Sequence, residues 1–195
     1  MENLYHSGYD ALYTRINQIQ PHPEELKKDI IQTSTIVKLD RKDIIVRPGE
    51  ISRHSYFIID GFVRIYRDHG RKESTTWFLN NNDFMLQVHG SFFGNPSPEY
   101  LQATDPTTCI KMHIDDQEEL FRKYPMFFVT YTKLIHIYYT QLIDRDSCKA
   151  LSAKEKYLKL LEEYPYIIQK AQSAHIASYF GISETYYSKI KNNRV

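Results

Sequence analysis

The side chains best suited to molecular recognition lie near the end of the chain, after Gly181. Hydroxyl, amide, carboxylate and amine groups match the donors and acceptors that base edges present in the major groove of DNA, and basic groups bind its phosphates. We expect Glu184 and Lys189 at base edges, and Lys191 and Arg194 at phosphates. The predicted DNA contacts are Ser183, Glu184, Thr185, Ser188, Lys189, Lys191, Asn192 and Arg194.

Two short helices joined by a glycine turn must position these residues. The apolar spacing over 173–180 predicts a first helix, and Gly181 supplies the positive φ of a tight turn. Ser183 can cap a second helix, whose Tyr187 and Ile190 would pack back on the first. The pattern predicts a helix-turn-helix. A surface helical hairpin without a DNA role is the alternative.

The charge is distributed unevenly along the chain. The formal net charge is +1, so the whole molecule has no general attraction to nucleic acid. From residue 152 to the end there are seven Lys or Arg against four acidic residues, a net charge of +3, which leaves −2 for the remainder. This imbalance fits a small DNA-reading module better than a non-specific DNA coat.

The composition excludes several other classes of protein. Two cysteines, Cys109 and Cys148, are too few for a disulfide scaffold, a structural zinc site or an iron–sulfur cluster. The sequence has no Gly-rich phosphate loop, no G-x-S-x-G and no H-E-x-x-H motif, so we expect neither catalysis, nor a metal, nor a cofactor. It also lacks an apolar leader and any long apolar run, so we expect a cytoplasmic protein with no membrane partner.

The first two thirds of the chain predict helices, then strands, then helices. Helices are expected over 9–20 and 24–33, and from Ser34 the apolar period changes to two, with turn signals about every 10 residues. This pattern predicts an α+β protein with an antiparallel β-sandwich or β-barrel whose last strand covers about 108–114. A short helix capped by Asp115 and Asp116 should follow, with Tyr124-Pro125 as its stop.

The longest expected helix covers 126–150 and is apolar on more than one side. One side can lie on the barrel and another on a second copy of the chain, which predicts a homodimer; the alternative is a helix wholly buried in its own domain. The expected dimer contacts are Phe128, Tyr131, Ile135, Tyr138 and Leu142. The spacing of Ser152 and Glu155 is that of a capping box, which starts another helix.

These elements predict three units: a sensor over 1–125, a dimerisation helix over 126–150 and a helix-turn-helix domain over 151–195. In this order they resemble the Crp/Fnr family of bacterial transcription regulators. The segment from Pro48-Gly49-Glu50 to Tyr56–Arg64 is similar to the "PGE…YxIxxGxV" signature of the cyclic-nucleotide-binding fold, a double-stranded β-helix. Residues 176–183 and 188–191 resemble the "IASYLGIS…LSRIR" variant of Bacteroidetes-type members. The resemblance implies a homodimer that binds inverted-repeat DNA and controls transcription, with RNA polymerase as a further partner.

The same resemblance shows where this chain departs from the family. Members that bind cyclic AMP use an arginine to neutralise the cyclic phosphate, whereas no arginine lies between Arg71 and Arg122 and Glu99 would meet the anion. We therefore expect no response to cyclic AMP and an unknown small-molecule effector, if any. The expected pocket residues are Phe84, Phe92, Glu99 and Tyr100. His89 and His113 are lone candidates for a haem ligand, and we expect no β-hairpin wing after the last helix.

Overall fold

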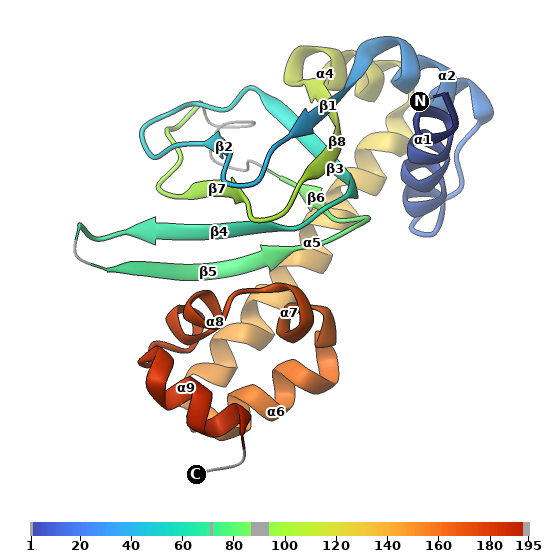
Figure 1. Cartoon of the computed structure of the whole chain (residues 1–195). Helices are drawn as coiled ribbons and strands as arrows, with labels where there is room; N and C mark the ends of the chain where they lie inside the picture. Colours follow the sequence, from blue (N-terminus) through green and yellow to red (C-terminus); the bar gives the residue numbers. More distant parts are fainter. Residues whose placement is uncertain (1, 71, 87–93, 193–195) are drawn as a thin grey trace.

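Two antiparallel sheets form a barrel near the start of the chain (Figure 1). The structure, a computed structural model, describes residues 2–70, 72–86 and 94–192. The first sheet has the order β1-β8-β3-β6 and the second the order β2-β7-β4-β5. The strands are β1 Ser34–Leu39, β2 Ile44–Val46, β3 His54–Asp60, β4 Val63–Asp68, β5 Glu73–Leu79, β6 Phe84–Met85, β7 Tyr100–Ala103 and β8 Thr107–His113. The predicted antiparallel α+β architecture is confirmed.

Two helices precede the barrel and pack against its first sheet: α1, Glu2–Asn17, and α2, Glu24–Thr33. Helix α2 has the predicted bounds, but α1 begins well before residue 9 and includes Gly8. A Cβ at Gly8 would lie 2.5 Å from the Cδ1 of Ile59 on β3. The glycine therefore lets α1 pack closely on β3, because a larger residue at this position would require the Ile59 side chain to move.

Helices α4, Ile114–Lys123, and α5, Pro125–Ser147, follow the barrel, and a 3-10 turn, Cys148–Ala150, continues α5. The predicted cap at Asp115 and Asp116 is wrong, because His113 is the N-cap and its Nδ1 accepts a hydrogen bond of 3.2 Å from the Asp115 amide. Pro125 does not only stop α4 but is also the first residue of α5, a position where its missing amide hydrogen costs nothing. No helix among the described residues is long and apolar enough to cross a bilayer.

Four helices of the C-terminal part lie below the barrel in Figure 1, next to strands β4 and β5. They are α6 Ala153–Glu163, α7 Pro165–Lys170, α8 Ser173–Phe180 and α9 Glu184–Lys191. The predicted capping box is present: the Ser152 hydroxyl accepts from the Glu155 amide, and the Glu155 carboxylate accepts from the Ser152 amide. Helix α7 was not predicted. One apolar core runs without a break from the barrel into these helices.

Candidate nucleic-acid interface

Helices α8 and α9 meet at the predicted glycine turn. Gly181 has a φ of 73°, in the left-handed region, and the Ile182 amide donates to the Ala177 carbonyl at 3.0 Å. This is the usual way to close the C-terminal end of a helix before a sharp change of direction. The Ser183 hydroxyl then accepts a hydrogen bond of 3.2 Å from the Tyr186 amide, so it caps α9 as predicted.

The apolar sides of the two helices are buried against each other and against α6. Tyr187 and Ile190 of α9 are buried, and the Tyr187 ring packs on Phe180 of α8 and Tyr157 of α6, with centroids 6.1 Å apart in both pairs. Burial raises the pKa of the Tyr187 phenol to about 12. Because this side of α9 is fixed inside, its opposite side must face solvent.

The outer side of α9 carries nearly all the predicted DNA contacts. Ser183, Glu184, Thr185, Ser188, Lys189, Lys191 and Asn192 are all exposed, whereas Arg194 lies outside the described residues. Lys189 and Lys191 form no ion pair with any residue that the structure describes, so their amines are available to phosphates or base edges. Tyr186 is 40% exposed on the same helix, although it was not among the predicted DNA contacts. Its position three residues before Lys189 is the signal that places it beside this surface.

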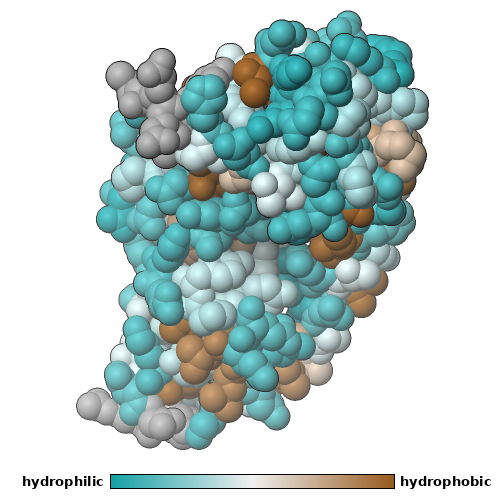
Figure 2. All heavy atoms as spheres, turned by 90° about the vertical axis from the view of Figure 1, so that its right-hand side faces the viewer, coloured by the Kyte–Doolittle hydropathy of each residue, from teal (hydrophilic) through white to brown (hydrophobic). Residues whose placement is uncertain are grey.

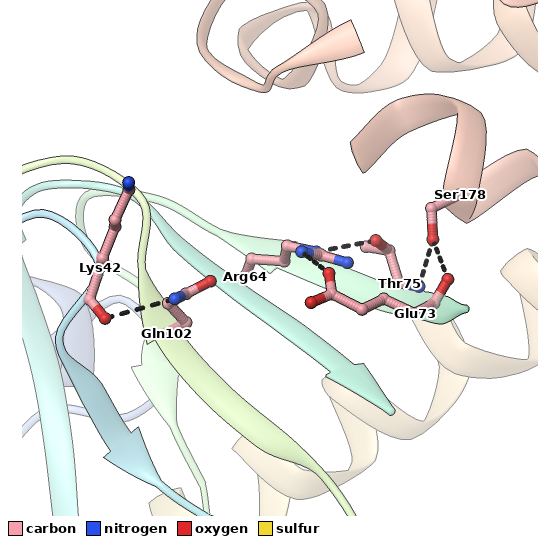
Figure 3. A network of polar contacts seen from close by, with 6 residues as sticks. All are labelled: Lys42, Arg64, Glu73, Thr75, Gln102 and Ser178. Atoms are coloured by element: carbon pink, nitrogen blue, oxygen red, sulfur yellow. Dashed lines mark hydrogen bonds and ion pairs between the residues drawn. The ribbon is translucent and has the colours of Figure 1, made fainter. Parts of the chain in front are cut away.

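Helix α8 is fastened to the outer strand of the second sheet. The Ser178 hydroxyl donates to the Glu73 carbonyl at 2.7 Å and accepts from the Thr75 amide at 3.0 Å (Figure 3). Beneath this contact the buried Arg64 donates from Nε to the Thr75 hydroxyl at 2.9 Å and from Nη1 to the Glu73 carboxylate at 2.6 Å. The Arg64 guanidinium lies 4.3 Å from the centre of the Tyr66 ring. Arg64 thus stabilises the strand pair on which α8 is seated.

Aromatic side chains add a second fastening between the barrel and the C-terminal helices. Trp77 of β5 packs edge-on against Tyr164 and Tyr179, with ring centroids 5.0 Å and 5.6 Å apart. Lys170 of α7 donates to the Asn80 side chain at 2.7 Å. Polar and aromatic contacts together therefore fix the C-terminal helices on the barrel, and with them the exposed outer side of α9.

Helix α5 separates its apolar residues between its own barrel and solvent. Tyr131 is only 5% exposed, and the Tyr138 hydroxyl accepts a hydrogen bond of 2.9 Å from the Phe84 amide, so both side chains face the barrel of the same chain. Burial of Tyr138 and the nearby Asp83 raise the pKa of its phenol. Of the other predicted dimer contacts, Ile135 is half-buried, and Phe128 and Leu142 are exposed.

Apart from Met126 near its start, the large exposed apolar residues of α5 lie on one side of the helix. This α5 face consists of Phe128, Val129, Tyr139, Leu142 and Ile143. Figure 2 shows apolar atoms gathered mainly in the lower half and along one edge of the molecule, whereas its upper part, around α1 and α2, is largely polar. Tyr139 and Ile143 were not predicted to belong to an apolar side of this helix. Tyr139, Leu142 and Ile143 lie within steps of three and four residues, but apolar residues occupy more than one side of α5, so the spacing does not show which side is exposed.

The predicted ligand-pocket residues do not line a common cavity among the described residues. Phe84 packs on Phe57 between the barrel and α5, where a cavity of about 50 Å³ lies. Tyr100 is instead stacked on Tyr66, with centroids 4.8 Å apart. Phe92 and His89 lie outside the described residues. His113 is the cap of α4, and no group of three or more metal-binding side chains is found in the described part of the chain.

Glu99 also forms an ion pair that was not predicted from the sequence. Its carboxylate accepts from Arg67 Nε at 3.2 Å and from the Thr76 hydroxyl at 2.8 Å. The expectation that no guanidinium offsets Glu99 is therefore wrong, because β4 brings Arg67 beside it although the two are far apart in sequence. An incoming anion would find this guanidinium already paired.

Comparisons with known proteins identify the barrel. Residues 36–124 match the family model described as the cyclic nucleotide-binding domain. A comparison of the sequence with curated proteins finds no match. Among solved structures, FixK2 from Bradyrhizobium japonicum superimposes with a TM-score of 0.72 at 15% identity, covering 82% of this chain and 83% of that chain.

Two further solved structures also match most of the chain, including residues beyond the barrel. The c-di-GMP-responsive global regulator CLP from Xanthomonas campestris has a TM-score of 0.70 at 14% identity, with coverage of 88% of this chain and 91% of that chain. The catabolite activator protein of Thermus thermophilus gives 0.56 at 17% identity, with coverage of 89% and 84%. At such low identities the likeness shows the fold alone.

Proposed function

We propose that this chain, whose residues 36–124 form a cyclic nucleotide-binding domain, is a homodimeric, sequence-specific DNA-binding transcription regulator of the Crp/Fnr type. The observation that carries the proposal is the outer side of α9. It presents exposed hydroxyl, amide and amine groups on a helix whose other side is buried, after a capped glycine turn. This arrangement suits a helix that enters the major groove.

The solved structures support the proposal by analogy. Two of them are named as a global regulator of virulence gene expression and a catabolite activator, and each shares most of its length with this chain. They cover 88% and 89% of this chain, which is more than the part, residues 36–124, that matches the family model. Under this proposal, residues 1–125 sense, 126–150 dimerise and 151–195 read DNA.

The dimer would form through the α5 face. Its five apolar residues are 37–57% exposed, which is unusual for so many large side chains on one side of a helix. Pairing two copies along α5 would bury them and relate two α9 helices by a two-fold axis. Because the grooves on one side of DNA repeat every turn, such a dimer should read an inverted repeat with half-sites about 34–36 Å apart.

Within each half-site we assign different tasks to the two free lysines. Lys189 lies one turn after Glu184 and Thr185 on the outer side of α9, so it is the candidate for a guanine edge. Lys191 lies in the last turn of the same helix and is the candidate for a phosphate. Glu184 is suited to a cytosine amine or to orienting a neighbouring side chain.

The test begins with selection of bound sequences from a random duplex pool, followed by titration of the selected and a scrambled duplex. Lys189→Ala should weaken cognate binding by about 1–3 kcal/mol and relax the preference at one base pair. Lys191→Ala should weaken both duplexes alike and reduce the salt slope by about one. Lys38→Ala, an exposed lysine on β1, is the matched control and should change neither.

Two results would count against these assignments. If Lys189→Ala and Lys191→Ala reduced binding to both duplexes by the same factor, Lys189 would be a phosphate contact only. If the wild-type protein enriched no sequence and bound no duplex in a salt-dependent way, the helices α8 and α9 would serve an interaction module instead of a DNA reader.

A further inference from the structure

A crevice of about 460 Å³ opens between strand β5, the C-terminal end of α5 and helix α6. Its volume lies in the range of sites that hold small organic ligands. The walls come from both the barrel and the C-terminal helices, and the predicted pocket residues that the structure describes, Phe84, Glu99 and Tyr100, do not line it. We propose that this crevice binds a small aromatic anion, at a site separate from the barrel segment that corresponds to the cyclic-nucleotide pocket.

The apolar part of the site is aromatic. Trp77 and Phe180 are among its lining residues, and the Trp77 ring packs edge-on against Tyr164 and Tyr179, with centroids 5.0 Å and 5.6 Å apart. Aromatic side chains of this kind can pack edge-to-face or offset against a flat ligand. Because these side chains already pack on one another, a planar molecule can enter without a large loss of side-chain freedom.

The charged part of the site is Arg145. Its guanidinium carbon lies 3.9 Å from the centre of the Trp77 ring. Its Nη1 is buried and has no hydrogen-bond partner among the residues that the structure describes. Burial lowers the pKa of Arg145, although the phenols of Tyr179, Tyr164 and Tyr166 partly counter this effect. A carboxylate, sulfonate or phosphate would supply the missing acceptor through a charge-assisted hydrogen bond.

The crevice lining carries both acidic and basic side chains. Lys159 pairs with Glu163 at 3.5 Å, and Asp144 and Asp146 lie at exposed positions. Lys156, which is half-buried, forms no ion pair with any described residue. Arg145 and Lys156 are thus the cations of the crevice lining that form no ion pair with a described residue, which favours a ligand with an aromatic body and one acidic group.

Trp77 makes the site directly observable, since it is the only tryptophan of the chain. The probe is 8-anilinonaphthalene-1-sulfonate, an aromatic sulfonate, and the matched control probe is N-phenyl-1-naphthylamine, which has the same rings without the sulfonate. The full-length protein should bind the sulfonate saturably with near-complete quenching of Trp77 emission. The neutral probe should bind at least about tenfold more weakly, because it forms no charge-assisted hydrogen bond.

Variants separate this site from other apolar surfaces that bind the same dye. Arg145→Gln and Lys156→Gln should each weaken sulfonate binding, the first by about tenfold or more, whereas Arg145→Lys should retain part of the affinity. Lys38→Gln, on an exposed strand position, should leave it unchanged. Circular dichroism checks folding, and Lys156→Gln gives the answer if Arg145→Gln does not fold.

Equal affinity of wild type, Arg145→Gln and Lys156→Gln for the sulfonate would overturn the proposal. So would equal binding of the two probes, or saturation that leaves Trp77 emission unchanged. The assay contains no DNA, so its outcome does not depend on whether the chain is a transcription regulator.

Discussion

The hydroxyl of Ser178 on α8 donates a hydrogen bond of 2.7 Å to the backbone carbonyl of Glu73 on β5. The same oxygen accepts from the amide of Thr75 at 3.0 Å. Because β5 is the last strand of its sheet, these outward backbone groups have no neighbouring strand to pair with. The Ser178 hydroxyl therefore hydrogen-bonds the backbone groups that a further strand would otherwise pair with, and it attaches the C-terminal helices to the barrel.

Replacing this serine should loosen the attachment. Ser178→Ala leaves the Glu73 carbonyl and the Thr75 amide without their partner, which should cost about 0.5–1.5 kcal/mol of unfolding free energy because both groups are within reach of water. Urea unfolding measures the loss, and hydrogen exchange should speed up at the Thr75 amide. Ser188→Ala, an exposed position on α9, should change stability by less than about 0.5 kcal/mol. Equal stability of both variants would show that aromatic packing alone holds α8.

The α5 face gives a second prediction. Ile143 and Ile51 are both 49% exposed, but only Ile143 belongs to the α5 face. Ile143→Glu should place two carboxylates at the proposed two-fold interface. The free energy of dimer formation should then become less favourable by about 2 kcal/mol or more per dimer. Ile51→Glu, the matched control in a barrel loop, should leave it intact. Sedimentation at micromolar concentration distinguishes them, and a dimeric Ile143→Glu variant would exclude this face.

The sequence predicted several elements whose structure is decided by local chemistry. Gly181 and Ser183 define the turn and the cap of α9, and Ser152 with Glu155 defines the start of α6, because these signals act within a few residues. The bounds of α8 were predicted for the same reason.

Relationships between distant residues were not predictable in this way. The spacing of Tyr131 and Tyr138 shows that they share a helix side, but only the packed structure shows that this side faces the barrel of the same chain. The pairing of Arg67 with Glu99 and the seating of Ser178 on β5 depend on the order of strands. Periodicity carries no information on that order.

The two cysteines should differ sharply in reactivity. Cys109 is fully buried in β8, and burial raises the pKa of its thiol to about 12, so almost no thiolate forms near neutral pH. Cys148 is half-buried at the crevice, and its thiol donates to the Asp144 carbonyl at 3.0 Å. Iodoacetamide should add one group to the native protein, at Cys148, and two in urea, as read by intact mass and peptide mapping. Two additions to the native protein would contradict the burial of Cys109.

Cyclic nucleotides should not bind in a functional way. A cyclic phosphate needs an unpaired guanidinium, whereas residues 72–121 contain no arginine and Arg67 is held by Glu99. Burying the phosphate without a counter-charge would cost several kcal/mol, roughly 2–5. Calorimetry with cyclic AMP or cyclic GMP at about 1 mM should show no saturable heat beyond that of the open-chain nucleotide control. A dissociation constant in the low micromolar range would contradict this prediction.

Acid should weaken the structure through His175 on α8. Its Nδ1 is buried without a partner among the described residues, and burial, followed by the charge of Arg64, lowers its pKa from 6.5 to about 4, although Glu73 acts in the opposite direction. Between these two values the unfolded chain binds a proton that the folded chain does not, so stability is complete above pH 6.5 and falls as pH decreases towards 4. The loss should reach about 1–2 kcal/mol after allowance for partial exposure.

Urea unfolding of wild type and His175→Asn across this pH window isolates the effect. Asp83, whose pKa is raised by burial, changes stability in the opposite direction but does so equally in both proteins, so it cancels in the difference. The variant should therefore lose less stability than wild type on acidification, while His69→Asn, at an exposed position of the β4–β5 hairpin, should follow wild type. If all three proteins show the same dependence on pH, His175 is protonated as readily in the folded chain as in the unfolded one.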